Sequence, residues 1–140
     1  MSKMPSRLSL IVALFAGITF FSSCKKDKGS STPINGIIIT GTWKIDYCVE
    51  DQVDEAYLFE HYTFVFNTDG VLTAASDTNT TVGSWHADDD GVNEIHIDLG
   101  HNPPLNYLTK DWIIKAAQSN TIELVDDDSH GDMEVHFKRQ

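Results

Sequence analysis

Residues 62–74 read YTFVFNTDGVLTA, and this stretch decides the fold because it carries the pattern of a tight β-hairpin. Aromatic side chains alternate through Phe64 and Phe66, as expected of a strand with one buried face. The turn that follows ends in Gly70, which suits the left-handed position after a type I turn. The pairs expected across the hairpin are Phe66 with Leu72 and Phe64 with Ala74.

The rest of the chain repeats this period of two in short segments separated by turns. Besides the hairpin strands, the expected strands cover residues 42–50, 80–87, 95–99, 111–116, 121–125 and 133–137. Pro103 and Pro104 interrupt the pattern, because proline cannot donate to a central ladder. The sequence predicts an all-β fold, an antiparallel up-and-down meander of about eight strands that closes into a barrel and so leaves no free edge.

The first two segments of this domain carry their own expectations. Along residues 42–50, alternation predicts one inward face and one outward face. The side chains expected to point inward are those of Trp43, Ile45, Tyr47 and Val49. Residues 51–60 fit either a helical turn or a loop, and the sequence leaves both open.

Negative charge dominates the chain after residue 36. The whole sequence of 140 residues has a formal net charge of −11, while residues 37–140 carry twenty acidic and five basic side chains, or −15. Such a surface repels nucleic acid and anionic headgroups, so a nucleic-acid partner is not expected, and the charge favours solubility. The sequence shows no nucleophile elbow, phosphate loop or close carboxylate pair in an apolar setting, so it predicts a protein that is not an enzyme.

An apolar segment with a basic start precedes the domain. Lys3 and Arg7 supply positive charge, and residues 8–21 form an apolar stretch of 14 residues. A membrane-spanning helix needs about 20 residues, so this stretch is too short to span a bilayer. It fits instead a cleavable export signal that covers residues 1–23.

The end of this signal, Phe21-Ser22-Ser23-Cys24, resembles the lipobox of bacterial lipoproteins, although Phe21 stands where that pattern usually has leucine. The resemblance implies that the thiol of Cys24 receives a diacylglyceryl group and that cleavage makes Cys24 the first residue of the mature chain. Lys25 follows, with no sign of the family's inner-membrane retention signal, so the implied location is the outer membrane, on either face. The alternative is a chance cysteine near the cleavage site of a soluble export signal.

Residues 24–36 are predicted to comprise the lipidated cysteine and a polar, flexible tether, and residues 37–140 the barrel domain. If Cys24 is lipidated, Cys48 has no partner for an internal disulfide. We therefore expect Cys48 to be a small, partly buried apolar side chain and not a catalytic thiol.

Four elements of residues 41–138, in order behind the lipobox, resemble the lipocalin-like domains of small bacterial lipoproteins. They are Gly41-Thr42-Trp43, Phe64-x-Phe66-Asn67-x-Asp69-Gly70, Gly83-x-Trp85 and Asp111-Trp112-x-Ile114. The terminal helix of true lipocalins has no counterpart in the sequence. The resemblance implies a calyx-like barrel without specifying its ligand.

The aromatic residues expected on the inner face are the candidate ligand-binding residues: Trp43, Phe64, Phe66, Trp85 and Trp112. A barrel of eight strands is just wide enough to be filled by side chains or to hold one small ligand, and both interpretations stay open. The first makes the protein a membrane-anchored module that binds or presents a small apolar or amphipathic molecule. The alternative is a packed barrel that docks another cell-envelope protein.

The sequence predicts no cofactor and no metal site. The acidic run that begins at Asp88 lacks required ligands of a calcium loop, and residues 126–128 lack a suitably placed glycine. If Trp85 pairs with Ile95, His86 would lie opposite Glu94 with His96 diagonal to it, a set that could hold zinc. The favoured interpretation of these three side chains is an exposed polar face.

Overall fold

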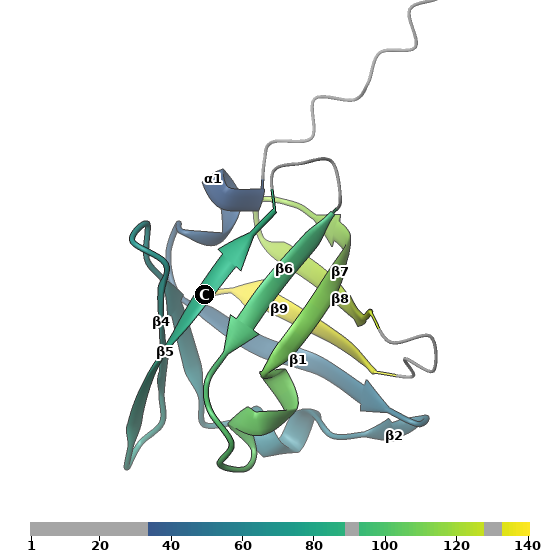
Figure 1. Cartoon of the computed structure of the whole chain (residues 1–140). Helices are drawn as coiled ribbons and strands as arrows, with labels where there is room; N and C mark the ends of the chain where they lie inside the picture. Colours follow the sequence, from purple (N-terminus) through teal and green to yellow (C-terminus); the bar gives the residue numbers. More distant parts are fainter. Residues whose placement is uncertain (1–33, 89–92, 128–132) are drawn as a thin grey trace, which may run out of the picture.

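The computed structural model describes residues 34–88, 93–127 and 133–140, which form a barrel with a short helix at one end (Figure 1). The strands are β1 (Trp43–Glu50), β2 (Val53–Asp54), β3 (Thr63–Phe66), β4 (Val71–Ala75), β5 (Thr80–Ala87), β6 (Glu94–Asp98), β7 (Lys110–Ala117), β8 (Thr121–Asp126) and β9 (Glu134–Arg139). The helical elements are α1 (Ile34–Ile38) and the 3-10 helices η1 (Ala56–Phe59) and η2 (Leu105–Leu108). The predicted export signal, Cys24 and residues 25–33 of the predicted tether lie outside the described residues.

Antiparallel pairing of successive strands closes the barrel. Each strand from β3 to β8 pairs with the next one along the chain, and β1 pairs with both β3 and β9. The short strand β2 adds two residue pairs at the end of β1, so the other eight strands make the barrel. The predicted all-β up-and-down meander is confirmed, with β2 as an addition. Closure leaves each barrel strand with a partner on both sides, although β1 and β3 meet at a single residue pair, Trp43 with Phe64.

The hairpin of β3 and β4 has the predicted register. Phe64 lies opposite Ala74 and Phe66 opposite Leu72, and all four side chains are buried. Gly70 adopts a φ of 81°, the left-handed conformation that the turn requires and that glycine adopts without strain.

Strand β1 departs from the predicted alternation at its middle. Trp43 and Ile45 are buried as expected, but the pairing with β9 shifts by one residue between Ile45 and Tyr47. This bulge turns the later side chains over, so Tyr47 is 40% exposed and Cys48 is buried. The prediction that Tyr47 and Val49 point inward is therefore wrong.

Residues 51–60 combine a turn, a short strand and one 3-10 turn. Asp51 and Gln52 both have positive φ, at 50° and 67°, and they reverse the chain between β1 and β2. In η1 the side chain of Phe59 is buried, so the end of this segment packs against the core. The sequence did not decide between a helical turn and a loop for residues 51–60, and the segment contains both.

Helix α1 begins at Ile34, within the last residues of the predicted tether, and it packs on one end of the barrel (Figure 1). Ile37 and Ile38 are buried, and the indole nitrogen of Trp43 donates to the Ile38 carbonyl at 2.8 Å. From β9, Arg139 Nη2 donates to the Ile37 carbonyl at 3.0 Å, while its guanidinium lies 4.9 Å from the Trp43 ring centre. These contacts fix α1 to the seam between β1 and β9. No helix among the described residues is long and apolar enough to cross a membrane.

Candidate functional site

The five aromatic residues predicted on the inner face, Trp43, Phe64, Phe66, Trp85 and Trp112, all lie in the core, and none is more than 6% exposed. Several of their rings meet edge to face. Phe66 lies 5.6 Å from Trp85 and 5.7 Å from Phe137 between ring centres, and Phe64 lies 5.4 Å from Phe137. Such contacts are typical of a close-packed aromatic core. The five residues therefore act as packing inside the barrel, and Trp85 also borders a pocket at its rim.

This rim pocket lies between α1, the β3–β4 turn and the end of β5, and its volume is about 320 Å³. The residues that line it are Asn35, Ile39, Thr68, Gly70, Trp85, His86 and Ala87. Ala87 follows two residues after Trp85 on the same strand face, at the position where β5 leaves the barrel. The pocket is therefore a depression at the end of the barrel and not a central cavity.

The pocket combines an apolar wall with polar groups at its edge. Trp85, Ile39 and Ala87 supply the apolar surface. The Trp85 indole nitrogen donates to the Asn67 carbonyl at 3.0 Å, so that hydrogen bond is already made within the protein. Side chains with hydrogen-bonding atoms, such as Thr68 and His86, complete the lining. An apolar surface with a few polar groups is the usual composition of small-molecule sites.

The histidine arrangement considered from the sequence has a different register. Trp85 pairs with Ile97 and not with Ile95, so His86 lies directly opposite His96. Their ring centres are 5.0 Å apart, and His96 Nδ1 lies 2.6 Å from Asp111 Oδ1 on β7. The structure thus brings the two histidines together with Asp111, while Glu94 pairs with the β7 backbone at Ile113.

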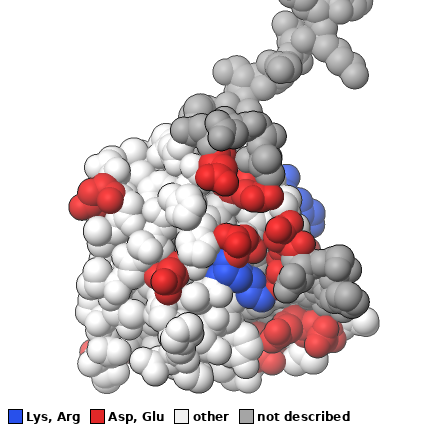
Figure 2. Space-filling model, in the orientation of Figure 1, with Lys and Arg blue, Asp and Glu red and all other residues white. Residues whose placement is uncertain are grey.

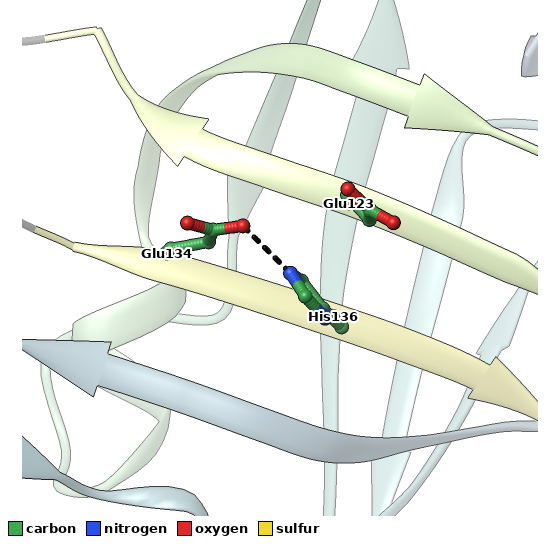
Figure 3. Close-up of side chains that lie close together, drawn as sticks. All are labelled: Glu123, Glu134 and His136. Atoms are coloured by element: carbon green, nitrogen blue, oxygen red, sulfur yellow. Dashed lines mark hydrogen bonds and ion pairs between the residues drawn. The ribbon is translucent and has the colours of Figure 1, made fainter.

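A second group of metal-ligating residues, which the sequence did not suggest, lies on the outer face of β8 and β9: Glu123, Glu134 and His136 (Figure 3). One potential ligand atom from each residue lies within 4.8 Å of the others. The alternation Glu134-x-His136 places both side chains on one face, which is visible in the sequence. The pairing of Glu123 with His136 depends on the β8–β9 register, which the sequence does not give.

The thiol of Cys48 is buried and makes no disulfide within the described residues. Burial, followed by the nearby charges of Glu55, Glu50 and Asp54, raises the pKa of Cys48 to about 12. The thiol therefore stays protonated at neutral pH, whereas a nucleophilic cysteine needs a lowered pKa. These properties match the expected role as an apolar core residue.

Acidic side chains gather on the face of the barrel seen in Figure 1, as Figure 2 shows. Partial loss of hydration and the charges of Asp127, Asp88 and Asp111 raise the pKa of Glu94 on β6. Crowding of like charges has this effect because it disfavours the ionised form. This face is therefore rich in negative charge, in keeping with the overall charge of the sequence.

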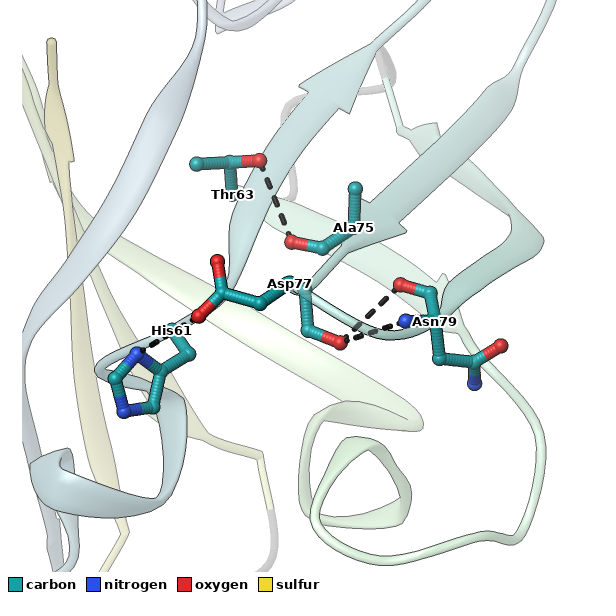
Figure 4. Close-up of polar contacts among 6 residues, drawn as sticks. His61, Thr63, Ala75, Asp77 and Asn79 are labelled. Carbon is teal, nitrogen blue, oxygen red and sulfur yellow. Dashed lines mark hydrogen bonds and ion pairs between the residues drawn. The ribbon is translucent and has the colours of Figure 1, made fainter.

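The turn between β4 and β5 carries an exposed ion pair (Figure 4). His61 Nδ1 lies 3.4 Å from Asp77 Oδ2, and both side chains are largely exposed. Thr63 donates to the Ala75 carbonyl beside it at 3.4 Å. An exposed pair of this kind contributes little to stability, about 0–1 kcal/mol.

No sequence-family model and no curated protein matches this chain. Among solved structures, the barrel is similar to the crystal structure of a DUF4847 family protein from Bacteroides vulgatus ATCC 8482, with a TM-score of 0.57 and 15% identity. The match covers 76% of this chain and 97% of that one. At this identity the likeness establishes a common architecture only. The chain is therefore a β-barrel protein that shares its fold with that DUF4847 family protein.

Proposed function

We propose that this protein is a lipid-anchored cell-envelope protein whose barrel binds a small apolar or amphipathic molecule in the rim pocket. The observation that carries the proposal is the pocket between α1 and the end of β5, with a volume of about 320 Å³. Ligand sites in proteins have volumes of roughly 300–1,000 Å³, so this pocket suits a small ligand. The aromatic core beneath it supplies a rigid floor, because Trp85 is held by Phe66 and by the Asn67 carbonyl.

The position of α1 relates the pocket to the proposed anchor. Asn35 and Ile39, which line the pocket, lie in or next to the first described element of the chain. A flexible tether from Cys24 to Ile34 would span roughly 15–20 Å root-mean-square. The anchored barrel would then hold the pocket end close to the bilayer, where amphipathic molecules concentrate. The lipid on Cys24 supplies the membrane contact, since each buried methylene contributes about 0.8 kcal/mol.

A pocket-filling variant tests the ligand proposal. We expect Ala87→Phe to occupy the pocket, because Ala87 lines it and has room on that side. The control is Val82→Phe, which adds the same ring on the same strand at a side chain that is 67% exposed. Organic extracts of the purified wild-type chain and of the control should contain the same co-purifying small molecule by mass spectrometry, and extracts of Ala87→Phe should lack it. Identical extracts from all three proteins would refute the pocket as the site.

The anchor has an independent test. Replacing Cys24 with alanine should abolish incorporation of a labelled fatty acid and release the chain from the membrane fraction. Persistent labelling of the Cys24→Ala chain would refute the assignment, and it would do so without bearing on the pocket.

One observation favours a second candidate, in which a solid barrel docks another envelope protein. The aromatic interior is packed, and Val53 and Tyr57 are more than half exposed on the excursion around β2 and η1. Absence of any co-purifying molecule from the wild-type chain, with specific loss of a cross-linked envelope protein in Tyr57→Ser, would favour this candidate. Loss of the small molecule in Ala87→Phe would favour the first.

A further inference from the structure

The outer face of β8 and β9 holds three potential metal ligands on a rigid frame. Glu123 on β8 lies directly opposite His136 on β9, and Glu134 precedes His136 by two residues on the same strand face. Leu124, which follows Glu123, and Val135, which lies between Glu134 and His136, are buried, so the three neighbouring polar side chains lie on the outer face. Figure 3 shows the two carboxylates and the imidazole on neighbouring strands, with the Glu134 carboxylate facing the ring. Sites built on paired strands are positioned more accurately than sites on loops.

The spacing of the ligand atoms is close to that of a zinc site. His136 Nε2 lies 2.8 Å from Glu134 Oε1, and one atom from each of the three residues lies within 4.8 Å of the others. Zinc bonds of about 2.0–2.2 Å in tetrahedral geometry place the ligand atoms about 3.4 Å apart. To reach this spacing, the Glu134 carboxylate would move slightly away from His136 Nε2 and the Glu123 carboxylate would move closer to it. Rotation of the flexible glutamate side chains can supply both movements. The strand backbones need not shift.

The group also attracts a cation in its present state. Lys115 Nζ on β7 lies 2.6 Å from Glu134 Oε1, the same oxygen that faces His136. The Lys115 side chain is 52% exposed, so its ammonium can swing into solvent when another cation takes its place. The cluster is therefore not only acidic, because it combines an imidazole, two carboxylates and a bound ammonium.

A neighbouring ring holds the imidazole in place. Tyr47, which the bulge in β1 turns outward, stacks on His136 with 4.4 Å between ring centres and 24° between planes. The stack restricts rotation of the histidine and keeps Nε2 directed at Glu134. Outer contacts of this kind orient metal ligands and reduce the cost of ordering them.

We propose that Glu123, Glu134 and His136 form a zinc-binding site in which the metal ion displaces the Lys115 ammonium from Glu134. One imidazole nitrogen and two carboxylate oxygens are ligands that zinc uses, and a solvent molecule can take the fourth position of a tetrahedral ion. Calcium takes six to eight oxygen ligands and magnesium an octahedral shell, so this set does not suit them. The bound ion would join β8 to β9 beside the seam with β1.

The test is a calorimetric titration of the purified full chain in mild detergent with zinc chloride, in buffer free of chelators. The wild-type chain should bind zinc at one site, and its melting temperature should rise with added zinc. Glu123→Gln and His136→Phe should each weaken binding by roughly 100-fold, because each removes one of three ligands. The phenylalanine keeps the stack on Tyr47, and circular dichroism checks that both variants are folded.

The variant Lys115→Met is the more specific test, because it should bind zinc more tightly than the wild type does. Removing the positive charge that competes with the ion for Glu134 should tighten zinc binding on the order of tenfold, even at high dielectric. His61→Phe is the matched control, since it removes a histidine from an exposed histidine–carboxylate pair and should leave binding unchanged. The proposal is overturned if the wild-type chain binds no zinc, if Glu123→Gln and His136→Phe bind as the wild type does, or if Lys115→Met does not bind more tightly. Loss of binding in His96→Phe, with the three proposed ligands intact, would likewise overturn it in favour of the His86 and His96 pair.

Discussion

Replacing Gly83 with alanine should destabilise the barrel more than a single added methyl group usually does. Gly83 lies in β5 opposite Leu72, and the backbone of β6 approaches it closely on the other side. A Cβ atom at this position would lie 2.0 Å from the carbonyl oxygen of Asp98 and 3.0 Å from its carbonyl carbon. Cβ atoms essentially never lie within 3.0 Å of such neighbours, so Asp98 and its neighbours would have to move by about 1 Å. The obstacle is backbone, which cannot rotate away as a side chain can.

The expected cost follows from what that movement breaks. Asp98 lies opposite Ser84 in the β5–β6 ladder, so a shift of about 1 Å weakens the hydrogen bonds at the end of this pairing. Each lost hydrogen bond costs about 1 kcal/mol, and strain from overpacking adds about 1–3 kcal/mol. We therefore expect Gly83→Ala to lower the free energy of unfolding by about 3 kcal/mol. For a domain of this size, that corresponds to a melting temperature lower by about 12–20 °C.

Urea unfolding followed by circular dichroism measures this loss, and Gly100→Ala is the matched control. A Cβ atom at Gly100 would meet no atom of the described residues within 4 Å, but Gly100 has a φ of 81°, so alanine there meets backbone strain without a steric clash. That strain should cost about 1–2 kcal/mol. A loss below about 1 kcal/mol for Gly83→Ala, or a loss no greater than that of Gly100→Ala, would refute the reasoning.

Three further expectations concern the packing and the charges of the barrel. Arg139→Met should cost about 2 kcal/mol and speed hydrogen exchange in α1, because it removes a charged hydrogen bond and a cation–π contact, and Arg139→Lys should restore only part of the loss. In a Cys24→Ala chain, Cys48 should be unreactive toward a thiol reagent at about pH 8 until urea unfolds the protein, and rapid labelling of the native chain would contradict its raised pKa. Hydrogen bonds from Lys115 and then His136 lower the pKa of Glu134 in the folded protein. The stability that ionised Glu134 contributes to the fold is therefore complete above its pKa in the unfolded chain, and it is lost as the pH falls through its pKa in the folded protein. The difference in urea midpoint between wild type and Glu134→Gln should therefore shrink as the pH falls below about 4.3, the ordinary pKa of glutamate, and a constant difference would argue against it.

Local pattern predicted the hairpin of β3 and β4 because turn chemistry and alternation agree there. Gly70 fixes the turn, and the turn fixes the register of Phe64 and Phe66. The bulge in β1 could not be predicted in the same way, because it arises from pairing with β9, more than eighty residues away. Tyr47 and Cys48 exchange faces as a result, and no residue near them in the sequence signals the change.

The candidate sites show the same dependence on register. The sequence placed Trp85 on the inner face correctly, but paired it with Ile95 where the structure pairs it with Ile97. A slip of two residues leaves every side chain on its original face, so the hydrophobic pattern cannot detect it. The slip nevertheless decides that His86 meets His96 and not Glu94. Sites made by side chains across strands therefore lie beyond what alternation alone can specify.

The packed interior and the rim pocket together restrict where a ligand could bind. A core of edge-to-face rings cannot admit a molecule without separating contacts such as Phe66 with Trp85, at a cost of several kcal/mol. The rim needs no such separation, because the space beside Ile39 and Ala87 is already present. One wall of that space is α1, which Arg139 and Trp43 fasten to the β1–β9 seam. The shape of the pocket thus depends on closure of the barrel, so the proposed binding at the rim should be coupled to the integrity of the β1–β9 seam.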